Sequence, residues 1–143
     1  MRLELLLSTC LLAAGCTSDG PAVEPPSAAA PAGHELTSHA GTWRVVYRTR
    51  PEAIPLNEPF GLTVWVLDPQ PGGAPRADVK LVVDAGMPQH MHGMNRVPTL
   101  SPRDDGGFDV DGLLFHMPGE WTLTFDVERG GITERAECVV ELE

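Results

Sequence analysis

The chain has 143 residues, of which 42% are hydrophobic, so it has room for one packed domain and a tail. Its formal net charge is −10 at pH 7. So acidic a chain cannot neutralise a row of phosphates, which excludes nucleic acid as a partner and disfavours electrostatic binding to anionic lipid.

The amino-terminal residues have the pattern of an export signal. An apolar run from Leu5 to Ala14 is too short to span a bilayer but suits a signal peptide. The run ends in Leu12-Ala13-Ala14-Gly15-Cys16, which resembles the lipobox of bacterial lipoproteins. The resemblance implies that residues 1–15 are a lipoprotein signal peptide and that Cys16 is lipidated. An ordinary secretory signal with an incidental cysteine is the alternative.

Lipidation would anchor the protein to a membrane surface without spanning the membrane. Thr17 follows the cysteine where an Asp would suggest retention at the inner membrane. We therefore expect a lipid-anchored protein of the cell envelope, at the outer membrane, on its periplasmic or surface side. Residues 16–41 are rich in Pro, Ala, Ser and Gly, which predicts a disordered tether in which His34 and His39 are solvated.

Residues 42–143 have the pattern of an all-β domain. Apolar and polar residues alternate in short segments that Gly/Pro turns separate, and no useful window shows helical periodicity. Strands are expected at residues 43–48, 60–66, 79–84, 96–100, 108–115, 121–127 and 132–142. This spacing predicts a seven-stranded immunoglobulin-like β-sandwich, preceded by the signal peptide and the tether.

Two segments of this domain concentrate methionine and histidine. Residues 87–94 contain Met87, His90, Met91, His92 and Met94, and the second segment contains His116 and Met117. Apart from the initiator, these are all the methionines of the chain. If seven strands run alternately up and down, the two segments follow the third and fifth strands and lie at the same end of the sandwich. In an extended segment, alternate residues such as His90, His92 and Met94 project to one side.

This combination of ligand types predicts a copper site. Imidazoles suit Cu(II) and thioethers suit Cu(I), so a mixed set can hold either ion. The candidate ligands are His90, His92, Met94, Met91, Met87, His116 and Met117. Zinc is a further possibility. The alternative is that the methionines fill gaps under a long loop while the histidines only form hydrogen bonds.

The residues from Met87 to Val127 resemble the YtkA-like domain family of exported bacterial proteins. The matching features are the Met/His segment, Pro98, Gly107-Phe108-Asp109-Val110 and the run from Gly112 to Phe125, which contains His116-Met117-Pro118-Gly119-Glu120-Trp121. The resemblance implies a small exported β-sandwich, often lipid-anchored, with a link to copper handling. The chain is also similar to the wider group of periplasmic copper-carrier sandwiches.

No pattern in the sequence indicates catalysis. Neither a nucleophile elbow nor a phosphate-binding glycine loop is present, and no Ser–His–Asp set is recognisable, so we do not expect an enzyme. Cys138 is expected to be a buried structural thiol, and Trp65, on an outer face, either contacts a partner or pairs with a neighbour. The acidic group from Asp104 to Asp111 lacks the spacing of a calcium loop.

The sequence therefore leads to two hypotheses from different classes. The first is an exported, lipid-anchored copper-binding protein that serves as a carrier, buffer or assembly factor. Its partners would be the membrane, through Cys16, and a copper donor or acceptor protein. The second is a structural or protein-interaction module of the envelope that binds no metal.

Overall fold

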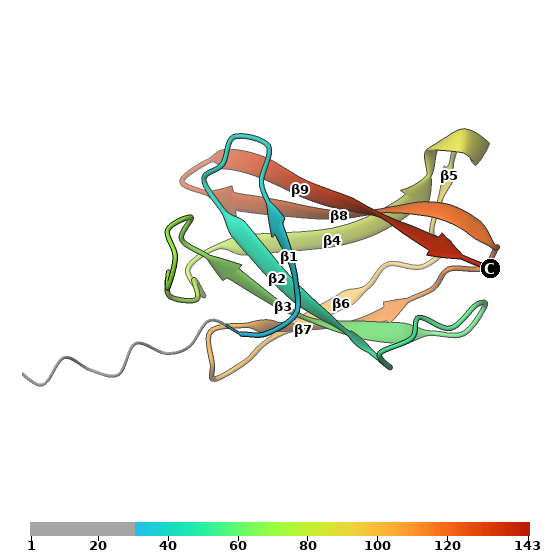
Figure 1. Cartoon of the computed structure of the whole chain (residues 1–143), viewed down its shortest axis with the longest axis horizontal. Coiled ribbons are helices and arrows are strands. Elements are labelled where there is room, and N and C mark those ends of the chain that lie inside the picture. Colours follow the sequence, from blue (N-terminus) through green and yellow to red (C-terminus); the bar gives the residue numbers. More distant parts are fainter. Residues whose placement is uncertain (1–30) are drawn as a thin grey trace, which may run out of the picture.

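The structure is a computed structural model that describes residues 31–143 (Figure 1). Its elements are β1 (His34–Thr37), β2 (Arg44–Arg50), β3 (Phe60–Leu67), β4 (Lys80–Met87), the 3₁₀ turn η1 (Pro88–His90), β5 (His92–Gly93), β6 (Thr99–Pro102), β7 (Phe108–Leu113), β8 (Gly119–Arg129) and β9 (Ile132–Leu142). Within residues 31–143, no helix is long and apolar enough to cross a membrane.

The strands form two antiparallel sheets, which confirms the prediction of an all-β fold. One sheet has five strands in the order β1-β2-β3-β7-β6, and the other has four in the order β5-β4-β8-β9. Figure 1 shows the sheets lying one over the other, with η1 and β5 raised at one end of the molecule, the end at which the C-terminus also lies.

The core lies between the two sheets and follows from the period-two pattern. In β8 the inward side chains of Trp121, Leu123, Phe125 and Val127 are all 0% exposed. Each fully buried side chain of this size stabilises the fold by about 1.5–3 kcal/mol. Because the outward residues of the same strand are partly exposed, β8 has one face in the core and one face towards solvent.

The predicted count of seven strands is wrong, because residues 31–143 form nine. The two additional strands are short: β1 has four residues and β5 has two. Strand β1 pairs with β2 from His34↔Tyr47 to Thr37↔Arg44, inside the range 16–41 that was predicted to be a tether. A four-residue edge strand depends on backbone pairing rather than on buried side chains, so composition did not reveal it.

The histidines of the expected tether have structural surroundings as well. The ring of His34 stacks on Tyr47 at a centroid distance of 5.0 Å. His39 Nε2 lies 3.6 Å from a carboxylate oxygen of Glu137 on β9. The predicted signal peptide at residues 1–15, the lipidated Cys16 and residues 17–30 of the tether lie outside the described residues.

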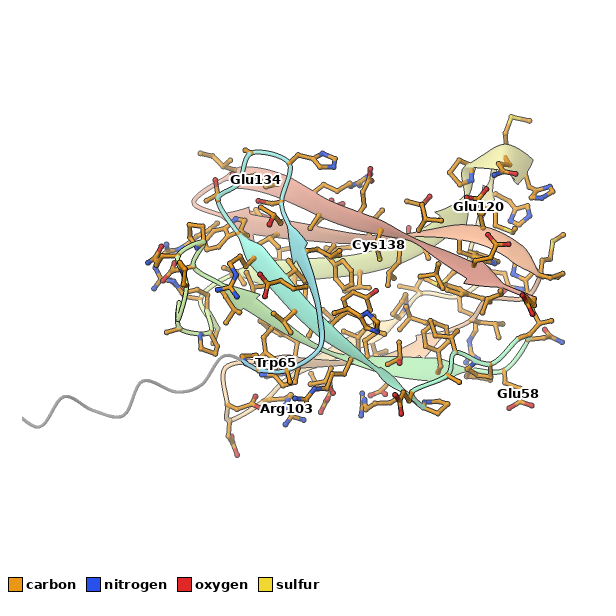
Figure 2. The ribbon with its side chains drawn as sticks, viewed as in Figure 1. Glu58, Trp65, Arg103, Glu120, Glu134 and Cys138 are labelled. Carbon is orange, nitrogen blue, oxygen red and sulfur yellow. The ribbon has the colours of Figure 1, made fainter. Side chains whose placement is uncertain are left out.

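Trp65 pairs with neighbours on the outer face of the five-stranded sheet. It packs with Val46 and Leu67 in a small second cluster, and the guanidinium carbons of Arg48 and Arg103 lie 5.4 and 6.0 Å from its ring centre. Figure 2 shows Arg103 beside Trp65 on this face. Cation–π contacts of this kind let a tryptophan remain buried outside the main core. Of the two roles predicted for Trp65, the structure shows the pairing.

The same face holds most of the acidic group. Arg103 donates to the carboxylates of Asp105 and Asp109, and Arg50 lies 3.1 Å from a carboxylate oxygen of Asp111. The guanidinium of Arg103 lowers the pKa of the Asp105 carboxyl through these hydrogen bonds. The acidic side chains of this face therefore have arginine partners.

Ser38 offers a test of how firmly the unexpected amino-terminal strand is attached. Its Oγ accepts from Trp43 N at 3.0 Å and donates to Glu134 Oε2 at 2.8 Å, and Ser38 is 3% exposed. We expect Ser38→Ala to lower the free energy of unfolding by about 1–3 kcal/mol, because it leaves a buried N–H without a partner. Urea denaturation measures this change. The exposed Ser101 is the control, since Ser101→Ala should change the free energy of unfolding by less than about 0.5 kcal/mol. Equal effects of the two substitutions would contradict the hydrogen-bonding role assigned to Ser38.

Candidate functional site

The two Met/His segments lie together at one end of the sandwich. The first forms the end of β4, η1 and β5, and the second connects β7 to β8. The ring centroids of His92 and His116 are 5.2 Å apart. The prediction that the topology brings the two segments to the same end is therefore confirmed.

A tight turn places His92 opposite the end of β4. Pro88 begins η1, and the turn closes with a hydrogen bond from Met91 N to Pro88 O. Met91 has a φ of 55°, in the left-handed region that is strained for a residue other than glycine, Asn or Asp. The chain then reverses, so that His92 pairs with Met87, and the Met91 side chain is left 93% exposed.

Three imidazole rings form a row across the two segments. His90 and His92 have centroids 5.8 Å apart, and His92 and His116 have centroids 5.2 Å apart. Two imidazoles on one tetrahedral ion, with metal–nitrogen bonds of about 2 Å, have ring centres about 5 Å apart. The ring spacing of His92 and His116 therefore fits a shared tetrahedral ion, and the wider spacing of His90 and His92 fits a shared ion with a larger nitrogen–metal–nitrogen angle.

Two ring nitrogens of this row have no hydrogen-bond partner among the protein atoms of residues 31–143. The Nδ1 atoms of His92 and His116 are buried and unpaired. A buried polar atom without a partner lowers the stability of the fold by about 1–3 kcal/mol. Such atoms therefore occur mainly where a water or an ion serves as the missing partner. A neutral imidazole nitrogen is a common metal ligand, so the chemistry of these two residues fits a bound ion.

The histidines alone do not make a complete metal centre. Among residues 31–143, no group of three or more His, Cys, Asp or Glu side chains is arranged to hold a metal ion. Methionine thioethers are therefore the donors that could complete a site around the histidine pair.

The four methionines of the first and second segments differ in their surroundings. Met94 and Met117 are partly buried and pack against the core beside the two loops. Met87 is 1% exposed, because the alternation of β4 continues to its last residue and turns this side chain into the core. Met87 thus has the packing role of the alternative hypothesis, and Met91 points to solvent. The seven candidate ligands do not form one cluster.

Trp121 is a residue of this site that the sequence analysis did not include among the candidate ligands or their neighbours. Its Nε1 donates to Met117 O at 3.0 Å, and its ring stacks on Phe115 at 4.6 Å. The rings of His116 and His92 approach it edge-on, at 5.3 and 6.1 Å. One indole therefore fixes the second segment and contacts the histidine pair. The signals in the sequence are its place four residues after Met117, at the first inward position of a strand, and its place in the run that resembles the YtkA-like family.

A side-chain contact also joins the first segment to the start of β8 at the surface. Gln89 in η1 donates from Nε2 to Glu120 Oε2 at the start of β8. Figure 2 shows Glu120 beside the raised η1 and β5. This hydrogen bond holds the turn of η1 over the connection between β7 and β8.

A groove gives solvent access to His92. It has a volume of about 450 Å³ and runs between the η1–β5 turn and the outer face of the four-stranded sheet. Its lining includes Met91 and His92 on one side and Asp84, Thr124 and Glu137 on the other. His92 can therefore be reached from outside although its Nδ1 atom is buried.

Cys138 is a free thiol in the inward row of β9 and is partly exposed. Its Sγ lies 3.3 Å from the hydroxyl oxygen of Tyr47. Burial raises the pKa of the Cys138 thiol, and burial together with this contact raises the pKa of Tyr47. The thiol therefore stays protonated at neutral pH, which suits the predicted structural role more than metal binding.

Comparison with family models found no matching family, and comparison with curated proteins and with solved structures found no similar protein. The resemblance to YtkA-like domains therefore remains a prediction from the residues quoted above.

The role of the indole can be tested without any metal. We expect Trp121→Phe to lower the free energy of unfolding by about 1–2 kcal/mol, because it removes a buried hydrogen bond and some ring volume. We also expect it to shift the NMR signals of the His92 and His116 rings, which the indole contacts. Trp65→Phe, on the other sheet, is the control and should leave these signals in place. Unchanged histidine signals in Trp121→Phe would contradict the role assigned to the indole.

Proposed function

We propose that this protein binds copper through His92 and His116 and acts as a carrier, buffer or assembly protein of the cell envelope. The observation that carries the proposal is the histidine pair itself. Two partly buried rings from separate segments lie 5.2 Å apart, and each has a buried Nδ1 atom without a partner. This arrangement costs stability unless a water or an ion bonds to these nitrogens, and we propose an ion.

The choice of copper rests on the methionines of the same two segments. Met94 and Met117 lie on the same two segments and supply thioethers, which are ligands for copper and poor ligands for zinc. Two imidazoles and one or two thioethers can hold either Cu(I) or Cu(II). A carrier benefits from such a set, because it can release the ion again by ligand exchange.

The cellular setting of the proposal comes from the sequence. An export signal and a lipidated Cys16 would tether the domain to a membrane of the envelope, with the outer membrane preferred. For the two antiparallel sheets we propose the immunoglobulin-like type of sandwich, as in the YtkA-like family. The proposed activity is binding and transfer of the ion to or from a partner protein, without catalysis.

One observation favours the second candidate function, an interaction module without metal. Met87 is buried in the core, and Met94 and Met117 also pack against the core. Methionines often fill irregular gaps in this way. In that case the exposed Met91 and Val97, at 93% and 90%, would be contacts for a partner protein.

Copper titration separates the two functions. The purified protein lacking residues 1–15 is titrated with Cu(I) and with Cu(II) against competing chelators. We expect His92→Ala and His116→Ala each to weaken binding by at least about tenfold, or about 1.4 kcal/mol. His39→Ala is the matched control, because this exposed histidine lies in the turn between β1 and β2. Binding equal in all four proteins, or absent from the wild type, would support the module without metal.

The membrane anchor is tested separately. We expect Cys16→Ala to move the exported protein from the membrane to the soluble fraction, because no acyl chain would then hold it there. Fractionation of cells followed by immunoblotting measures the distribution. Cys138→Ala is the control and should remain with the membranes. A Cys16→Ala variant that stays with the membranes would refute lipid anchoring.

A further inference from the structure

The three histidines of the site differ in depth. His90 is exposed, while His92 and His116 are partly buried. The row therefore leads from solvent, at His90, to the ring of His116, which rests against the fully buried Trp121. The ring spacing is 5.8 Å at the first step, which suits an ion held at a wide angle, and 5.2 Å at the second, which suits a tetrahedral ion.

The same three residues do not converge on one point. No three of the histidine, cysteine and carboxylate side chains within residues 31–143 are arranged to share an ion. The row consequently offers two overlapping pairs instead of one three-histidine centre. His92 belongs to both pairs, so it is the one side chain that an ion moving along the row would not need to leave.

We propose that copper reaches its site in two stages, with His92 as a pivot. The ion first binds between His90 and His92, and then the bond to His90 breaks as a bond to a nitrogen of His116 forms. The two imidazoles exchange places without any change in the charge of the ion, and no electron is transferred. His90 is thus a capture residue that is absent from the final ligand set. This inference rests on the proposed copper binding.

The surroundings of the two pairs support this direction of movement. The outer pair lies on the strained turn, and its residue His92 also borders the open groove. The inner pair has the two buried, unpaired Nδ1 atoms, and its residue His116 precedes Met117, whose carbonyl Trp121 holds. The outer pair is open to solvent and the inner pair is fixed in place, which suits rapid capture outside and retention inside.

Stopped-flow kinetics can test the order of events. The purified wild type lacking residues 1–15 is mixed with Cu(II) ions, and quenching of tryptophan fluorescence reports arrival beside Trp121. Release is measured by mixing the copper-bound protein with an excess of chelator. The variants are His90→Ala, His116→Ala and, as the matched exposed histidine, His39→Ala.

We expect His90→Ala to slow both binding and release by about tenfold. By microscopic reversibility the two rates fall by the same factor, so the dissociation constant should change by less than about twofold, as for an ordinary exposed substitution. We expect His116→Ala to weaken the dissociation constant, and His39→Ala to change neither the rates nor the constant.

Three results would overturn the inference. If His90→Ala weakens the dissociation constant as much as His116→Ala does, the three histidines form one centre. If His90→Ala alters neither rate, His90 plays no part in capture. If the wild type binds no copper, the proposed function falls and the inference falls with it. The first two results leave the proposed function standing.

Discussion

The packing of Trp121 between the sheets governs the whole end of the molecule that carries the two Met/His segments. The indole is 0% exposed and stacks on Phe115, so its position is set by the core. Its single N–H donates to Met117 O, which fixes the connection between β7 and β8. The ring of His116 then rests on an immobile surface and meets His92 from the other segment. A flexible loop could not hold two imidazole rings at a fixed spacing in this way.

The sequence predicted what depends on local pattern. The alternation of apolar residues located the strands of both sheets, and counting them placed the two Met/His segments at one end. The sequence did not reveal β1, because an edge strand of four residues is held mainly by backbone hydrogen bonds to β2 and needs no alternation of buried side chains. The sequence also did not reveal that Met87 turns into the core, because the Met/His segment looked continuous although β4 extends to its first residue. The unpaired Nδ1 atoms and the bond from Trp121 depend on tertiary packing, which no spacing reveals.

Several local features of this end oppose stability. Met91 occupies a left-handed backbone conformation, and two buried imidazole nitrogens lack partners. Each costs about 1–3 kcal/mol. By contrast, on the outer face of the five-stranded sheet, Trp65 has a cation–π contact with an arginine and the neighbouring acidic side chains form ion pairs with arginines. Within residues 31–143 these unfavourable features therefore lie together at one end, and such departures from local rules are expected at functional sites.

The short length of β5 has a consequence for the behaviour of the protein in concentrated solution. Since β5 pairs only with Gly86 and Met87, it leaves the edge of β4 from Lys80 to Asp84 uncovered by its own strand. Such an edge can accept an extended segment of a neighbouring molecule and begin aggregation. The charges of Lys80 and Asp84, and the mutual repulsion of chains that carry −10 each, oppose this pairing. Charge repulsion between molecules should therefore oppose aggregation least near the isoelectric point of about 4.8, where the net charge vanishes.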